Sequence, residues 1–280
     1  MDQDAARAVV QGTAGKRYRV DCGARVTDAE KLRRIAELDG EKGPDRKTLD
    51  LLSALIKLRI DVKKRIAAQP VSPELRQKRL SEGEPLVRRQ DVVVDLRDAV
   101  RQWRALEKLF KGQGIAVDTV PDPEQSIREF IKKGESVSDV HHFMLLEVLK
   151  PFYEAYAEAY GKQVDDAVWV RHYCFVCGSS PDMAVLTGDG GKRYLYCRLC
   201  DTRWWYARLK CPFCNSENAE KLVVMSLENE PAGVVHACTV CNRYLKVFDT
   251  RVQNGLFLEL EDLCTAHLDG MARAEGFARG

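Results

Sequence analysis

The sequence predicts a multidomain protein of helices and strands: a helical N-terminal domain, then two small β modules that each bind a metal ion, then a C-terminal helix. Its 280 residues suit two or three domains. Up to about residue 165, apolar side chains recur at helical spacing; beyond it, short β-branched and aromatic runs alternate with turn residues. Eight of the ten cysteines form four C-x-x-C pairs in this second part. We expect the boundaries 1–165, 166–209, 210–251 and 252–280.

The first part is predicted to contain at least four helices. Two are indicated by apolar residues at steps of three and four. A shorter helix is framed by Asp122 as N-cap, Pro123 just inside and Gly134 after its end. Residues 138–160 read as another helix, interrupted or kinked at Pro151. The first two helices carry Leu51, Leu55, Leu58, Val62 and Ile66, and Leu96, Val100, Trp103, Leu106 and Phe110.

Other features of this part are interpreted as structural. The charged run RLSEGEPLVRRQD, residues 79–91, is expected to be a solvated loop. His141 and His142 are adjacent, so they cannot chelate well from one helix face. An aromatic stripe is expected to pack in the core rather than line a partner groove. It consists of Phe152, Tyr153, Tyr156 and Tyr160.

Charge and hydropathy argue against several classes of partner. The formal net charge is +2, from 44 basic and 42 acidic residues, so no global attraction to nucleic acid or membrane is expected. The first residues lack the apolar core of a signal peptide, and no stretch approaches the ~18 apolar residues of a membrane span. We therefore expect a cytoplasmic protein.

The cysteine region is an internal repeat. Each unit reads as C-x-x-C, a hairpin, a second C-x-x-C and a further strand, with 19 and 23 residues between the pairs. A hairpin turns the chain back on itself and so brings its flanking pairs together. This spacing is typical of tetrahedral thiolate sites, and in a reducing compartment it favours metal binding over disulfides. The predicted sites are Cys174, Cys177, Cys197 and Cys200, and Cys211, Cys214, Cys238 and Cys241.

The rival grouping places the two middle pairs around one ion. It would require DTRWWYARLK, residues 201–210, to bend sharply, whereas this run lacks turn residues and is predicted to be a strand. Two independent sites follow, so Cys174→Ser should remove one ion and spare the other. The residue after each pair supports metal knuckles, because Gly, Asn and Asp tolerate positive φ. These residues are Gly178, Asp201, Asn215 and Asn242.

A basic, aromatic stretch lies between the two sites. Residues 191–210 carry six basic residues and one acidic residue. They either neutralise the thiolate sites or form a partner-binding face. Trp204 and Trp205 should point to opposite faces of their strand, so one can be exposed. The candidate face comprises Arg203, Trp204, Trp205, Tyr206 and Arg208.

The remaining candidate ligands are not needed for these sites. His172 and His236 each precede a knuckle by two residues, but four thiolates already complete each site. Cys264 is expected to pack in the interior, and Cys22 has no assigned role. All-thiolate sites suit iron or zinc, and their closed coordination argues against catalysis at the metal.

The segments that carry these motifs resemble the FdhE family of formate dehydrogenase accessory proteins. The resemblance rests on YCFVCGSSP, GKRYLYCRLCDTRWWYARLKCPFC, CTVCNRYLKVF and the closing AEGFARG, and it covers residues 173–279. Over residues 1–165 the likeness is only a helical domain of suitable size. One departure is Phe175, which follows Cys174 where a proline is common.

The resemblance implies a non-enzymatic, cytoplasmic protein required for active formate dehydrogenase, with that enzyme's catalytic subunit as its partner. It implies rubredoxin-like or zinc-ribbon-like modules in which the eight cysteines hold two ions per chain, iron being expected and zinc an alternative. Two other functions stay open from the residues: a rubredoxin-like electron carrier and a nucleic-acid-binding ribbon protein. The low net charge weighs against nucleic acid. A homodimer is left open, and no membrane partner is expected.

Overall fold

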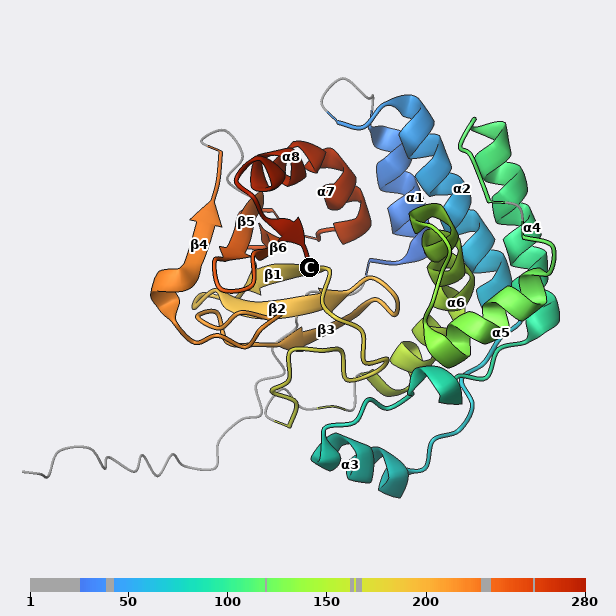
Figure 1. Cartoon of the computed structure of the whole chain (residues 1–280), viewed down its shortest axis with the longest axis horizontal. Coiled ribbons are helices and arrows are strands. Elements are labelled where there is room, and N and C mark those ends of the chain that lie inside the picture. Colours follow the sequence, from blue (N-terminus) through green and yellow to red (C-terminus); the bar gives the residue numbers. More distant parts are fainter. Residues whose placement is uncertain are drawn as a thin grey trace, which may run out of the picture.

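The computed structural model describes residues 26–38, 43–118, 120–161, 164, 168–227, 233–253 and 255–280. Helices occupy the first half of the chain and a sheet with two further helices the second (Figure 1). Cys22 and residues 228–232, within the predicted second hairpin, lie outside the described residues. None of the described helices is long and apolar enough to cross a membrane.

Six α-helices and a short 3-10 turn make up the first half of the described chain. Each α-helix begins at a Ser, Thr or Asp whose side chain accepts a hydrogen bond from a backbone amide of the first turn. The predicted cap Asp122 and the left-handed Gly134 bound α5 as expected. The elements are α1 (Asp28–Glu37), α2 (Arg46–Lys63), α3 (Pro73–Glu82), η1 (Arg89–Asp91), α4 (Leu96–Gly112), α5 (Pro123–Lys133) and α6 (Asp139–Tyr160).

Helix α2 packs against α1, α4 and α6, and α6 also packs against α4. Helix α6 continues through Pro151, whose missing amide leaves the carbonyl of Glu147 without its helical donor. The side chain of Gln102 on α4 fills this role, because its Nε2 donates to Glu147 O at 2.9 Å. The predicted aromatic stripe is largely buried here, with only Tyr160 more exposed.

The second half of the chain builds one seven-stranded sheet, in the order β3-β2-β1-β6-β5-β4, with β7 beside β6. Each cysteine repeat supplies a three-stranded antiparallel unit, and the two units join through parallel pairing of β1 with β6. The strands are β1 (Met183–Thr187), β2 (Lys192–Cys197), β3 (Thr202–Trp205), β4 (Leu222–Met225), β5 (Gly233–Cys238), β6 (Arg243–Asp249) and β7 (Ala278–Arg279), with η3 (Ala219–Lys221) before β4.

The strand expected over residues 201–210 is shorter than predicted. β3 ends at Trp205, and residues 206–213, here called the crossing segment, pass over one face of the sheet to the second repeat. The buried guanidinium of Arg193 donates to Ala207 O and Lys210 O. The carbonyls of the crossing segment thus accept hydrogen bonds from a side chain rather than from a neighbouring strand. The sequence pattern gave no sign of this contact.

The expected C-terminal helix is two helices and a strand. α7 (Leu258–Cys264) and α8 (Ala266–Ala274) meet at Thr265, whose φ of −109° and ψ of 29° are not helical. The chain then adds β7 alongside β6. The segment that contains α7 and α8 covers the sheet face opposite the shared core, and α7 also packs beside α1 and α2 (Figure 1).

The helical half and the sheet share one apolar core. It joins Trp103 of α4 and Met144 of α6 to Leu195 and Val247 on the inner face of the sheet, and it includes thiols of the first cysteine cluster. The expected solvated loop at 79–91 is wrong at both ends, which belong to α3 and η1, and in its middle, where Leu86 and Val87 are each 1% exposed and belong to this core. The charged residues on either side made this segment look solvated, although its two apolar residues are buried.

Candidate metal centres

The structure brings the eight paired cysteines into two groups of four. Within each group, the sulfur atoms all lie within 4.8 Å of one another. The hairpin β1–β2 joins the two pairs of the first group, and β4–β5 joins those of the second. The grouping of the two middle pairs around one ion is therefore excluded. The groups, here called the first and second cluster, are Cys174, Cys177, Cys197 and Cys200, and Cys211, Cys214, Cys238 and Cys241.

The sulfur separations fit four thiolates around a single ion. In the first cluster, Cys177 Sγ lies 3.4 Å from Cys197 Sγ and 3.7 Å from Cys200 Sγ. In the second, Cys214 Sγ lies 3.8 Å from Cys238 Sγ. Tetrahedral coordination with metal–sulfur bonds of about 2.3 Å places sulfurs about 3.8 Å apart. The nine described cysteines are free thiols.

Each C-x-x-C pair forms a knuckle closed by the backbone. The residue after the second cysteine donates its amide to the carbonyl of the first, over 2.8–3.1 Å in all four knuckles. That residue has φ between 53° and 77°, as its identity predicted. Asp201, Asn215 and Asn242 are the non-glycine residues with positive φ in the described chain. Short polar residues tolerate this conformation better than others.

The two clusters differ in burial. All four thiols of the first are buried, whereas in the second Cys214 is exposed and Cys241 half-buried. Burial raises the pKa of Cys174 well above its usual value, so a cation must displace its proton for the thiolate to form. At Cys238 burial also favours the thiol, but the backbone amides of Cys241 and Val240 outweigh it and lower the pKa.

A strap of backbone covers the first cluster. The amides of Leu86 and Val87 donate to Phe175 O and Val176 O, between the first two cysteines, at 2.7 and 2.8 Å. Nearby, Tyr173 Oη donates to Gly83 O at 2.6 Å. The strap thus holds the first knuckle from outside. The sequence of residues 79–91 did not indicate this strap, because its two central apolar residues are surrounded by charged ones.

The basic, aromatic stretch is mostly structural. Trp204 and Tyr206 are each 2% exposed, and the indole of Trp204 donates to Arg171 O. They therefore offer no contact surface, which corrects this part of the predicted partner-binding face. Trp205 points to the opposite face, as expected, and is half-buried against apolar residues of that face such as Tyr194 and Phe248. Arg203 is half-buried, and Arg208 is exposed.

The two histidines that precede the knuckles, His172 and His236, are not part of either thiol cluster. His172 Nδ1 lies 3.1 Å from the side-chain nitrogen of Asn215. For His236, burial and then the charges of Arg193 and Arg208 lower the pKa to about 4, so the ring is neutral near pH 7. Cys264 packs beside the apolar residues of α1 and α2, as expected of an interior cysteine.

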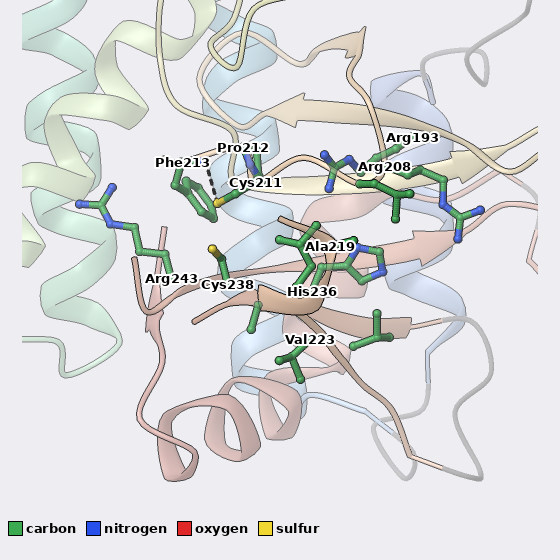
Figure 2. A pocket seen from close by; sticks show the side chains of 14 residues that line it. Arg193, Arg208, Cys211, Pro212, Phe213, Ala219, Val223, His236, Cys238 and Arg243 are labelled. Carbon is green, nitrogen blue, oxygen red and sulfur yellow. Dashed lines mark hydrogen bonds between the residues drawn. The ribbon is translucent and has the colours of Figure 1, made fainter. Parts of the chain in front are cut away.

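A cavity of about 130 Å³ adjoins the second cluster. It lies between the crossing segment and the β4–β5 hairpin, and Cys211 and Cys238 are part of its wall (Figure 2). Arg193 and Arg208 lie at one end and Phe213 at the other. Sequence reasoning did not find this site, because its lining comes from both repeats.

Comparison with known proteins points to a single family. A family model described as "FdhE, central domain" matches residues 173–208, which include the whole first cluster. The Protein FdhE homolog of Aquifex aeolicus is 31% identical over 156 residues, 55% of this chain and 54% of that protein. The homolog of Edwardsiella ictaluri is 40% identical over 112 residues, 39% of this chain and 36% of that protein. The chain thus matches about half, or less, of the length of these curated relatives.

The likeness of fold extends over nearly the whole chain. The crystal structure of the FdhE protein from Pseudomonas aeruginosa matches with a TM-score of 0.60, covering 90% of this chain and 91% of that chain. Sequence identity over this match is 22%, so the match itself shows a shared fold. It includes the helical half, where the sequence resemblance was weakest.

Proposed function

We propose that this chain, which is similar to FdhE proteins in sequence and fold, is a non-enzymatic accessory protein that binds the catalytic subunit of formate dehydrogenase during maturation. The observation that carries the proposal is that both thiol clusters are complete. Four sulfurs fill the coordination of a tetrahedral ion and leave no position for a substrate. The ions would then organise a docking protein rather than a reaction.

We propose one ion in each cluster, held by its four cysteines. Iron is the expected metal from the family resemblance, and zinc fits the same ligands. Thiolate sites of this kind persist where thiols stay reduced, which supports action in the cytoplasm. Within the predicted partner-binding face, Arg208 has the exposure that such a role requires.

A rubredoxin-like electron carrier is the second candidate. It is favoured by the exposure of Cys214, which opens the second cluster toward solvent. This function requires iron and predicts a reversible colour change on reduction, which zinc cannot show. The nucleic-acid-binding alternative loses support, because Trp204 and Tyr206 are buried and cannot serve as stacking platforms.

The test is an anaerobic pull-down with the tagged protein from cells that express formate dehydrogenase. We expect recovery of the catalytic subunit with the wild type and its loss with Cys211→Ser, which removes a ligand of the second cluster. Cys264→Ser is the matched control, because Cys264 is a free thiol outside both clusters. Recovery of nucleic acid alone, or of no specific protein, would contradict the proposal.

A further inference from the structure

The cavity beside the second cluster is lined by three arginines and by two cysteines of that cluster, and Asp249 lies near Arg208 outside the lining. Its lining includes Arg193, Arg208 and Arg243 and contains no aspartate or glutamate. Within the part of the chain that the structure describes, no carboxylate pairs with Arg193 or Arg208 within 4.0 Å. Most other buried cations of this protein are paired, as Arg59 and Lys246 are. Three guanidinium groups against the two thiolates of the wall leave the lining net positive, which favours an anion.

Arg193 is the residue that most needs a partner. It is 2% exposed, and its Nη2 donates to two carbonyls of the crossing segment. Its Nε is buried and has no hydrogen-bond partner among the described residues. Leaving such a buried donor without an acceptor is unfavourable. The carbonyls of the crossing segment satisfy Nη2, whereas Nε could donate a hydrogen bond to an oxygen of a bound ligand.

Apart from the arginines, His236 and the two cysteines, the lining is apolar and partly exposed. Leu209 and Val224 are 69% and 61% exposed at the rim, and Pro212 and Phe213 form the far wall. A cavity of about 130 Å³ is of the size that accepts one benzene-sized group. One apolar side chain therefore fills it. The cavity thus offers an apolar space next to a pair of guanidinium groups.

The adjoining strand favours an extended polypeptide as that ligand. β4 ends the sheet, and no described strand pairs with its outer edge (Figure 1). Val224 pairs with His236 and lies on the same face as the cavity lining. A strand added to this edge would place alternate side chains on that face.

We propose that this groove, formed by the crossing segment and the β4–β5 hairpin, binds an extended acidic–apolar segment of a partner polypeptide. An apolar side chain enters the cavity, and an Asp or Glu carboxylate contacts Arg193 and Arg208. The proposal rests on the function proposed above, since it names the surface through which the catalytic subunit docks.

The test measures binding of the purified formate dehydrogenase catalytic subunit to the full-length, metal-loaded protein under anaerobic conditions. Arg208→Glu and Val224→Asp should each weaken binding about tenfold or more, and Arg208→Lys should largely retain it. Arg97→Glu and Val137→Asp, at highly exposed sites of the helical half, are the matched controls and should change binding less than about twofold.

The outcomes separate the two proposals. If the wild type does not bind the subunit, the proposed function is contradicted. If the wild type binds and the groove variants bind equally well while retaining two ions, only the docking site is contradicted. A photo-reactive phenylalanine analogue replacing Val224 adds a second readout. It should cross-link to a segment with an acidic residue beside an apolar one, and cross-linking to a basic segment would overturn the proposal.

Discussion

At the scale of single residues, the knuckles depend on backbone conformation as much as on sulfur. Asp201, Asn215 and Asn242 adopt left-handed φ values of 57°, 60° and 53°. The turn lets the amide that follows each pair close the knuckle. A left-handed conformation costs an ordinary residue roughly 1–2 kcal/mol, and a β-branched one most of all. The left-handed backbone conformation therefore determines the residue type at these positions, although these residues are not metal ligands.

This argument makes Asn242 a clean test, because its side chain is exposed. Asn242→Val should lower the free energy of unfolding by about 1–2 kcal/mol and weaken ion retention in the second cluster. Asn242→Gly, which keeps the backbone freedom, should lie within about 0.5 kcal/mol of the wild type. Denaturant unfolding and metal content measure both effects. Equal behaviour of the two variants would show that φ does not limit the knuckle.

At the scale of elements, the two hairpins build similar clusters in different surroundings. The first cluster lies under the strap at Leu86 and Val87 and joins the shared core. In the second cluster Cys214 is exposed and Cys241 is half-buried. A ligand exchange there needs less local opening of the structure. The clusters should therefore differ in how readily they release an ion.

We expect a thiol-competing chelator to remove the two ions in two phases, the slower by about tenfold or more. The fast phase belongs to the second cluster. Cys174→Ser should bind one ion and show only the fast phase, whereas Cys214→Ser should show only the slow one. Absorbance of the chelator complex follows the release. A single phase in the wild type, or loss of both ions from Cys174→Ser, would rule out independent clusters of unequal access.

The sequence was informative about elements whose signals are local. Strand runs, helix caps such as Asp122, and the spacing of the pairs predicted both hairpins and the grouping of the thiols. Features that depend on distant partners were missed. The early end of β3 depends on the guanidinium of Arg193, and the strap depends on carbonyls about 90 residues away at Phe175 and Val176. Neither partner is visible from local periodicity.

The docking groove was missed for the same reason. Its walls come from β2, the crossing segment and the β4–β5 hairpin, which meet only when the two repeats join in one sheet. The sequence did place Arg208 in a candidate partner face, but it grouped Arg208 with the buried Trp204 and Tyr206. Alternation along a strand cannot say which face a later segment will cover.

At the scale of the whole molecule, buried ion pairs connect the helical half to α7, which lies against the sheet. Arg59 of α2 pairs with Glu147 of α6 at 2.8 Å and with Glu259 of α7 at 2.9 Å. All three side chains are at most 6% exposed. Burial alone would favour neutral acids, but Arg59 and Lys150 hold the pKa of Glu259 well below its usual value. Glu259 therefore contributes stability above the unfolded-state pKa, and this contribution is lost as the pH falls below it.

Replacing Arg59 should therefore weaken the whole fold rather than one helix. Arg59→Met leaves two buried carboxylates short of their partner and should lower the free energy of unfolding by about 3–5 kcal/mol. Because the core runs from α4 and α6 into the sheet, denaturant transitions followed by helical circular dichroism and by metal release should shift together. Arg46→Met breaks only an exposed pair with Asp50 and should cost less than about 1 kcal/mol. If the helical transition moves while metal release stays in place, the two halves unfold separately and the network does not couple them.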